Sequence, residues 1–538
     1  MSRILNKMTR NASTWNGALS NSNTGLSKFG ACLDYFFKAG TFVNRPQELV
    51  NKDMTSIFSD DEETALKILF GLRLITRKPK EMENVQTGYG RRDEFYKACV
   101  WLHENKPDIL YRNLHLIPVF GCWRDFLTEP LIDTLNRERV YELCAANLED
   151  QLLRKYLPQI RSSRKTRSER DKKRSAWAKG LCAYLNISPK DYRKIKSSGT
   201  AHIWQKQMHH KQWDSINFNG IPGKAMLIHT SRKGSDKQTV FERHNQVARL
   251  KEWVLGQKNV KFNGYPYDLL LAAKKNPSVV QKMVYDKQFE FILENMKDHK
   301  LGNVLACLDI SGSMASQVLP NVSAMDICLS MGIAFSAMNV GYFKDVVCGF
   351  SDSAITMKLF GGFCDRLQQI NTDANFQRVA WGSTNFQGVI DMLVNIRKDN
   401  PDIPVDEYPE TILVISDMQF NPASNWGYGG CQADSSEVKT NYETARSKLN
   451  EVGLNDMRII WWCVNGQTSD FPSTMDDKGV YMIGGFDPVN LKSLMGMDVP
   501  VQEAPKENQE KKEETPLDGM MNFLSQPIFN LLQTTKVS

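Results

Sequence analysis

The apolar residues of this chain change their spacing abruptly near Gly302. Before it, stretches such as LSKFGACLDYFFKAG and ERVYELCAANLEDQLLRKYL carry apolar residues at positions i, i+3, i+4 and i+7, which is typical of amphipathic helices. After it, short runs rich in β-branched residues, among them NVLACLD, ETILVIS and MRIIWWCV, alternate with helical stretches. Buried strands that alternate with helices predict a doubly wound α/β sheet. The sequence therefore predicts a multidomain protein in which an all-α region precedes an α/β region.

Five segments follow from this pattern and from local composition. Residues 1–25, rich in Asn, Ser, Thr and Gly, predict a lead-in loop. Helical periodicity, without a strict repeat, predicts a HEAT-like helical repeat domain over 26–298, and the α/β domain follows over 299–500. Residues 501–516, rich in Glu, Lys and Pro, predict a disordered linker. The apolar residues 517–538 predict a segment that either packs on the chain itself or binds a partner.

The sequence also indicates the compartment. The N-terminus lacks the apolar core of a signal peptide, and no stretch reaches the roughly 18 apolar residues of a membrane span. The 11 cysteines form no C-x-x-C pair, which predicts reduced thiols. We therefore expect a soluble cytoplasmic protein with no membrane partner.

Oxygen-bearing side chains follow the predicted strands in a fixed order. Asp309, Ser311 and Ser313 come directly after one strand (CLDISGSM), and Asp417 comes after another (LVISDMQF). Thr384, in WGSTNF, precedes a predicted helix. Ligands of open α/β sheets gather at the carboxyl ends of strands, and carboxylate and hydroxyl oxygens are ligands that Mg²⁺ prefers. The sequence predicts a divalent-cation site, with Mg²⁺ expected and Mn²⁺ as the alternative.

The order DxSxS, then T, then D resembles the metal-ion-dependent adhesion site (MIDAS) of the von Willebrand factor A family over residues 300–500. The resemblance implies that the first loop supplies Asp309, Ser311 and Ser313, the second Thr384 and the third Asp417. It also implies a coordination position left open for an acidic group of a partner. No base, nucleophile or second metal cluster accompanies these residues, so we expect a binding protein and not an enzyme.

Basic side chains concentrate in the middle of the chain. Residues 151–300 hold 32 basic and 12 acidic side chains, whereas residues 301–538 hold 16 basic and 29 acidic. Clustered Arg and Lys favour nucleic-acid phosphates because each contact releases counterions; the alternative is a solvated helix face. The residues predicted to bind RNA are Arg161, Arg164, Lys165, Arg167, Arg170, Lys172, Lys173, Arg174, Lys190, Arg193, Lys194 and Lys196.

A helical repeat region followed by a von Willebrand A domain resembles the TROVE-type Ro ribonucleoprotein family. Segments such as INFNGIPGKAM and VKFNGYPYDLL are similar to a divergent branch of that family. The resemblance implies a ring of helical repeats, closed through the A domain, with a basic surface that binds small structured RNAs. The resulting prediction is a non-catalytic RNA-binding scaffold. Two alternatives stay open: an adaptor whose metal site binds an acidic protein partner such as an AAA+ ATPase, and a structural component of a larger assembly.

Overall fold

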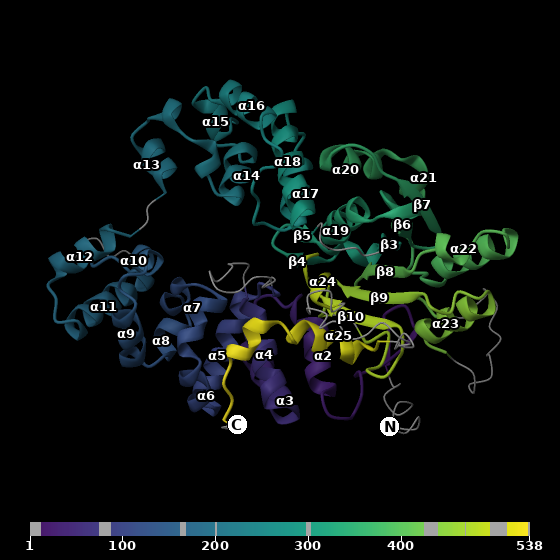
Figure 1. The fold of residues 1–538 in the computed structure, drawn as a ribbon, viewed down its shortest axis with the longest axis horizontal. Helices are drawn as coiled ribbons and strands as arrows, with labels where there is room; N and C mark the ends of the chain where they lie inside the picture. Colours follow the sequence, from purple (N-terminus) through teal and green to yellow (C-terminus); the bar gives the residue numbers. More distant parts are fainter. Residues whose placement is uncertain are drawn as a thin grey trace, which may run out of the picture. The chain divides into compact units, whose positions relative to one another are not determined.

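The chain forms two compact units, which are described separately below (Figure 1). The computed structural model describes residues 12–74, 88–161, 168–199, 202–296, 303–423, 439–467, 470–494 and 514–535. The helical unit comprises Asn44–Ile216 and Pro527–Ser538, and the sheet unit comprises Met1–Val43 and Asn217–Gln526. The predicted order, a helical region followed by a region with a sheet, is confirmed. The predicted domain boundaries stay predictions.

The helical unit consists of α-helices and short 3-10 helices among the residues that the structure describes. Its second helix shows why such segments form: the Asp61 side chain accepts a hydrogen bond from the Thr64 N–H at 2.9 Å, and acidic residues occupy the first turn, where they favour a helix N-terminus. The elements are α3 (Gln47–Asp60), α4 (Glu62–Arg73), α5 (Arg92–Asn105), α6 (Pro107–Arg112), η1 (Leu114–Leu116), α7 (Ile117–Phe120), η2 (Trp123–Leu127), α8 (Leu131–Thr134), α9 (Arg137–Ala146), α10 (Gln151–Tyr156), α11 (Glu169–Tyr184), α12 (Pro189–Ser197), α13 (Ile203–His209), η4 (Trp213–Ser215) and η9 (Pro527–Leu531).

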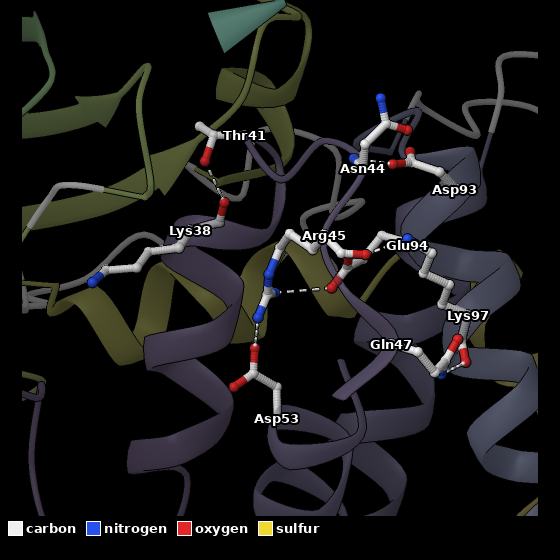
Figure 2. A network of polar contacts seen from close by, with 9 residues as sticks. All are labelled: Lys38, Thr41, Asn44, Arg45, Gln47, Asp53, Asp93, Glu94 and Lys97. Carbon is white, nitrogen blue, oxygen red and sulfur yellow. Dashed lines mark hydrogen bonds and ion pairs between the residues drawn. The ribbon is translucent and has the colours of Figure 1, made fainter. Parts of the chain in front are cut away.

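The start of the helical unit is held by a polar network (Figure 2). Arg45 donates to Glu94 Oε1 at 3.0 Å and to Asp53 Oδ2 at 2.5 Å, so one guanidinium joins α3 to α5. Beside it, the Asn44 N–H donates to Asp93 Oδ2 at 2.5 Å. These half-buried ion pairs hold the first residues of the unit in place. Separating them would leave a partly buried charge without its counter-charge, which is destabilising.

A buried ion pair holds the interior of the helical unit. Arg73, at the end of α4, donates from Nε to Asp125 Oδ2 at 2.8 Å and from Nη2 to Oδ1 at 3.0 Å. Tyr96 of α5 donates to the same carboxylate at 2.6 Å. Both charged residues are 1% exposed. The interaction ties α4 and α5 to η2.

The sheet unit is built around a six-stranded sheet with the order β10-β9-β8-β3-β6-β7. Helix α19 packs on β3 and β6, α22 packs on β6 and β7, and α2 and α25 pack on β10. The strands are β1 (Ala12–Ser13), β2 (Leu19–Ser20), β3 (Val304–Asp309), β4 (Gln317–Leu319), β5 (Val322–Ser323), β6 (Val346–Phe350), β7 (Ala354–Lys358), β8 (Thr411–Ser416), β9 (Arg458–Cys463) and β10 (Val480–Gly484). The helices are α2 (Gly30–Ala39), η5 (Phe218–Gly220), α14 (Gly223–Ser231), α15 (Val240–Arg243), α16 (Val247–Leu255), α17 (Pro266–Ala273), α18 (Val279–Met296), η6 (Gly312–Ala315), α19 (Ala324–Met338), η7 (Gly341–Phe343), α20 (Phe363–Thr372), α21 (Ala374–Val379), α22 (Gln387–Asp399), η8 (Val405–Glu407), α23 (Asn441–Glu451), α24 (Asn490–Leu494) and α25 (Pro516–Leu524).

The sheet is mixed and not wholly parallel. Strands β3, β6, β8, β9 and β10 are parallel to their neighbours in this group, as the buried apolar runs predicted. The exception is β7, which the apolar pattern did not predict and which pairs antiparallel with β6. Only residues 351–353 connect the two strands, and so short a connection can only turn the chain back antiparallel. Residues of β7 are half-buried or exposed, which explains why an apolar run did not mark it.

Segments from both ends of the chain complete the sheet unit. The N-terminal segment pairs Asn21 with Phe471 in an antiparallel bridge. Helix α25 buries Phe523 against Phe36 of α2, with ring centroids 5.3 Å apart. Helix α25, at the start of the predicted C-terminal segment, therefore packs on α2, whereas residues 501–513 of the predicted linker lie outside the described residues.

Two further observations concern the whole described chain. No helix in the described ranges is both long enough and apolar enough to cross a membrane. The ten cysteines within those ranges are buried free thiols, as the absence of paired cysteine motifs predicted.

Candidate metal centre and cationic pocket

The five predicted metal ligands lie in loops at one edge of the sheet. Strands β3 and β8 are parallel neighbours with Leu308 opposite Ile415. Asp309 is the last residue of β3 and Asp417 follows the end of β8, so both carboxylates leave the sheet at its carboxyl edge. Ser311 and Ser313 lie in the loop after β3, where the Gly312 N–H donates to Gly382 O at 3.0 Å and so joins this loop to the one that carries Thr384.

Hydrogen bonds orient the side chains of the first loop. Asp309 Oδ1 accepts from the Ser311 N–H at 3.0 Å, and its Oδ2 accepts from the Ser416 hydroxyl at 2.5 Å. The hydroxyl oxygens of Ser311 and Ser313 are 3.1 Å apart. The Asp417 carboxylate accepts from the Gln419 N–H at 3.2 Å. These contacts place carboxylate and hydroxyl oxygens together, which is the donor set of a hard cation.

No basic side chain pairs with either of the two carboxylates among the described residues. Asp309 is 0% exposed and Asp417 is 2% exposed. Burial, followed by the charge of Asp417, raises the pKa of Asp309 to about 7. Burial also raises the pKa of Asp417, although a hydrogen bond from Ser313 opposes this. Buried carboxylates are normally paired or coordinate a metal, so the residues present fit a divalent cation.

Backbone strain marks two of the three loops. Met418, directly after Asp417, has a φ of 65°, and Trp381, three residues before Thr384, has a φ of 75°. Side-chain-bearing residues rarely adopt this left-handed region, and such strain gathers at functional sites when the surroundings hold it in place. Here the Trp381 N–H donates to Ile310 O at 2.7 Å, which ties the second loop to the end of β3.

The N-terminal segment supplies a neighbour of the predicted cation ligands that the sequence did not indicate. Asn16 donates from Nδ2 to Gln419 O at 2.6 Å and to Thr384 Oγ1 at 3.3 Å. The Thr14 hydroxyl donates to Phe420 O at 2.5 Å, so the segment is attached to the loop after β8. Residues 14–16 lie in the predicted lead-in loop, and their only signal was a composition rich in Asn and Ser. Nothing in that composition specifies a partner at residue 384.

A pocket of about 640 Å³ opens over these loops. Ser313, Thr384 and Asp417 line it, together with Asn16 and Trp15 of the N-terminal segment, and Asp470 forms another part of its wall. The Trp15 side chain is 92% exposed. The described residues contain no group of three or more His, Cys, Asp or Glu side chains placed to share a metal, so a cation here depends on hydroxyl oxygens as well as the two carboxylates.

Replacing Asn16 by alanine is expected to weaken Mg²⁺ binding by roughly 10–100-fold, as the loss of a hydrogen-bond partner behind a metal ligand commonly does. The physical reason is that Asn16 holds Thr384 and the loop after Asp417 in place. Isothermal titration of the full chain with Mg²⁺ measures the effect. Trp15→Ala is the matched control, because it changes the same pocket wall without touching a predicted ligand and should leave the affinity unchanged. Equal affinities for Asn16→Ala and the wild type would contradict the role of Asn16.

The structure divides the residues predicted to bind RNA into three groups. Arg164, Lys165 and Arg167 lie outside the described residues. Four are paired with carboxylates of the same unit: Arg161 with Asp171, Lys172 with Glu169, Lys173 with Glu129 and Asp133, and Lys194 with Asp191. Among the described residues, the remaining five have no carboxylate partner: Arg170, Arg174, Lys190, Arg193 and Lys196.

Three of these five line one pocket of about 590 Å³ in the helical unit: Arg170, Arg174 and Lys196. Arg124 of η2 and Lys155 of α10 line the same pocket. The sequence did not single out these two residues, because Arg124 lies in a stretch with balanced charge and Lys155 precedes the run of basic residues that begins at Arg161. Their contribution depends on how η2 and α10 pack against α11 and α12.

Comparison with known families finds two matches. Residues 14–212 match a family described as a domain of unknown function, DUF2828, and residues 303–526 match another, DUF7788. No curated protein matches the chain. The five predicted cation ligands lie inside the second matched stretch, whereas Asn16 and the cationic pocket lie inside the first. The pocket over the predicted cation ligands is therefore formed by residues from both matched stretches.

Proposed function

We propose that this protein is a non-catalytic RNA-binding scaffold of the Ro type, in which the helical unit holds RNA and the sheet unit carries a divalent-cation site of the von Willebrand A kind. The proposal includes HEAT-like repeats that close into a ring, a cytoplasmic location and Mg²⁺ as the cation, with Mn²⁺ as the alternative. The observation that carries it is the set of basic side chains on α11 and α12 that lack carboxylate partners among the described residues.

Basic side chains that no neighbouring carboxylate neutralises favour binding of RNA. Paired residues such as Lys173 are already neutralised by neighbouring carboxylates. Lys190 and Arg193 are exposed on α12, and Arg193 donates only to the backbone oxygen of Pro189. Unneutralised Arg and Lys side chains attract a chain of phosphates, and binding is favoured by the counterions that the phosphates release. The expected ligand is therefore a polyanion, and RNA is the one that the Ro resemblance implies.

The metal pocket supports a second candidate function. Hydroxyl, amide and carboxylate groups line it, with no basic side chain among the lining residues that the structure describes. A cation bound by Asp309 and Asp417 offers the main positive charge there, which favours an acidic group of a partner. The alternative is therefore an adaptor that recruits an acidic protein, such as an AAA+ ATPase, through the metal, or a component of a larger assembly that uses the same contact.

Salt dependence of RNA binding tests the first proposal. Binding of the full chain to a structured RNA is measured by fluorescence anisotropy over a range of salt concentrations. Replacing Arg170, Lys190 and Arg193 together by alanine should weaken binding and lower the slope of log K against log salt by about 0.7–0.9 per lost phosphate contact. The charge-matched control replaces Lys344, Lys358 and Lys398 of the sheet unit, which are exposed, and should change the slope little. Absence of RNA binding at low salt would overturn the proposal.

Chelation separates the two functions. RNA binding through α11 and α12 should persist in EDTA, whereas capture of an acidic partner through the cation should disappear in EDTA and in Asp309→Asn. A partner that binds equally well with and without the cation would contradict the adaptor function.

A further inference from the structure

The 590 Å³ pocket of the helical unit brings cationic side chains together from four elements. Arg124 comes from η2 and Lys155 from α10, Arg170 and Arg174 come from the first turns of α11, and Lys196 comes from the end of α12. Arg161 also lines the pocket, but Asp171 pairs with it at 3.0 Å. These two charges neutralise each other, so the pocket retains an excess of positive charge.

Three of the remaining cations have neutral hydrogen-bond partners. Arg174 donates to Leu127 O at 3.3 Å, and Lys196 donates to Lys155 O at 3.4 Å. The Lys155 ammonium lies 3.1 Å from the ring nitrogen Nε2 of His202. Carbonyl oxygens and an imidazole orient the side chains but do not remove their charge. Positive groups held near one another without a counter-charge repel, and an anion that enters the pocket relieves that repulsion.

The pKa shifts of Arg174 and Lys196, the half-buried cations of the pocket, agree with this crowding of positive charge. Burial, followed by the charges of Arg170 and Arg124, lowers the pKa of Arg174. Burial, followed by the charge of Arg174, lowers the pKa of Lys196. In both cases the protonated form is less favourable than in water. A bound anion would reverse that shift, because an opposite charge nearby favours the protonated form.

The N-terminus of α11 lies at the pocket, and its first turn also carries the acidic Glu169 and Asp171. Ser168, which lines the pocket, is the N-cap of this 16-residue helix, and its hydroxyl accepts from the Asp171 N–H at 3.2 Å. The positive end of the helix dipole lies at this terminus and favours anions such as phosphate. Arginine also presents donors in a planar fork that matches two oxygens of one phosphate.

We propose that this pocket binds a phosphate monoester at the end of an RNA strand. The inference rests on the proposed RNA binding and adds the part of the RNA that is recognised. A monoester carries about −1.5 to −2 charges at neutral pH, whereas an internal phosphodiester carries one, so the monoester balances the clustered cations better. The volume of about 590 Å³ lies within the usual range for small-molecule sites, which leaves room for a terminal nucleotide next to Tyr156.

The test compares RNAs of one sequence that differ only at their ends. One RNA carries a 5′-monophosphate, a second a 3′-monophosphate and a third only hydroxyl ends, and the affinity of the full chain for each is measured at fixed salt. One of the phosphorylated RNAs should bind at least about tenfold tighter than the hydroxyl-ended RNA. Arg124→Ala combined with Arg170→Ala should remove this preference. Both residues are exposed, so the folded state should tolerate their loss, and a thermal melt checks this.

Lys190→Ala combined with Arg193→Ala is the matched control. These two charges lie in the same unit but do not line the pocket, so their loss should weaken all three RNAs equally and keep the preference for the phosphorylated end. Equal binding of the three RNAs by the wild type would overturn the inference while leaving RNA binding itself in place. A different result is that inorganic phosphate raises the melting temperature of the wild type, but not of the Arg124 and Arg170 variant, while neither protein binds RNA. That result would support a phosphate pocket and contradict the proposed RNA function.

Discussion

Asp309→Asn is expected to abolish the stabilisation of the folded chain by Mg²⁺. In the wild type, Mg²⁺ at a hundredfold excess over its dissociation constant should stabilise the sheet unit by about 2.7 kcal/mol. Removing one of the two buried carboxylates should lower the cation affinity by at least about 100-fold, because loss of a mere supporting residue already costs 10–100-fold. Differential scanning calorimetry with and without Mg²⁺, repeated with Mn²⁺, measures the response.

The same variant should behave differently without the cation. In the metal-free wild type the pKa of Asp309 is raised to about 7 by burial and by the charge of Asp417, from an ordinary value of 3.8. The folded state therefore holds a proton that the unfolded chain releases between about pH 4 and pH 7, so metal-free stability falls as the pH rises through this window. Asp309→Asn removes the titrating group and should lose this dependence, and it should be more stable than the metal-free wild type at pH 8.

Asp470→Asn is the control for this experiment. Asp470 lines the same pocket but is not one of the predicted ligands, so its replacement should keep the Mg²⁺ response. An unchanged Mg²⁺ response in Asp309→Asn, or a wild type that responds to neither Mg²⁺ nor Mn²⁺, would contradict the cation site.

Arg73→Ala is expected to destabilise the helical unit by about 3–5 kcal/mol, the usual result of removing one partner of a buried ion pair. Asp125 would keep its charge in a site that is 1% exposed. Within the described part of the chain, its remaining donors would be the Tyr96 hydroxyl, the Cys122 N–H and the Cys122 thiol. Burial raises the pKa of Tyr96, so its hydroxyl stays a donor and cannot supply a positive charge. Gly121 shows how closely the pair is packed: a Cβ at this position would lie 2.2 Å from Asp125 Oδ2.

The loss of Arg73 should also disturb the cationic pocket of the helical unit. Asp125 belongs to η2, and the same short helix presents Arg124 and the Leu127 carbonyl that accepts from Arg174. Hydrogen exchange resolved by peptide is the suitable measurement, because a chain with two units need not unfold in one step. Faster exchange is expected in α4, α5 and η2. Lys172→Ala, which breaks an exposed pair with Glu169, should leave exchange in those elements unchanged. If α4, α5 and η2 of Arg73→Ala exchanged hydrogen as slowly as in the wild type, the stabilising role of the Arg73–Asp125 pair would be contradicted.

The parts of the fold that were predictable are those that local spacing encodes. Strands β3, β6, β8, β9 and β10 are buried on both faces, so each appears in the sequence as a continuous apolar run. Such a run predicts a strand even though apolar and polar residues do not alternate in it. In contrast, β7 is a half-exposed edge strand, and its residues carry no comparable apolar signal. Edge strands pack on one side only, which weakens the hydrophobic pattern from which strands are predicted.

The predicted sites show the same division. Asp309 and Asp417 follow neighbouring parallel strands, so the order of strands and oxygen-bearing residues was enough to place them at one edge. For the basic residues, composition indicated the region of the chain but did not show which side chains lack a carboxylate partner or line the pocket. Lys172, Lys173 and Lys194 are neutralised by carboxylates, whereas Arg124 and Lys155 join the pocket from helices outside the basic cluster.

Local sequence was enough to predict the order of a helical and an α/β region, the buried strands and the oxygen-bearing residues after them, because each depends on neighbours a few residues away. Two contacts could be found only in the folded chain: Asn16 meets Thr384, 368 positions along the sequence, and Arg124 shares a pocket with Arg174 and Lys196. The reason is physical: a hydrogen bond or a charge interaction acts over a few ångströms of space, and the packing of whole helices and loops sets that distance.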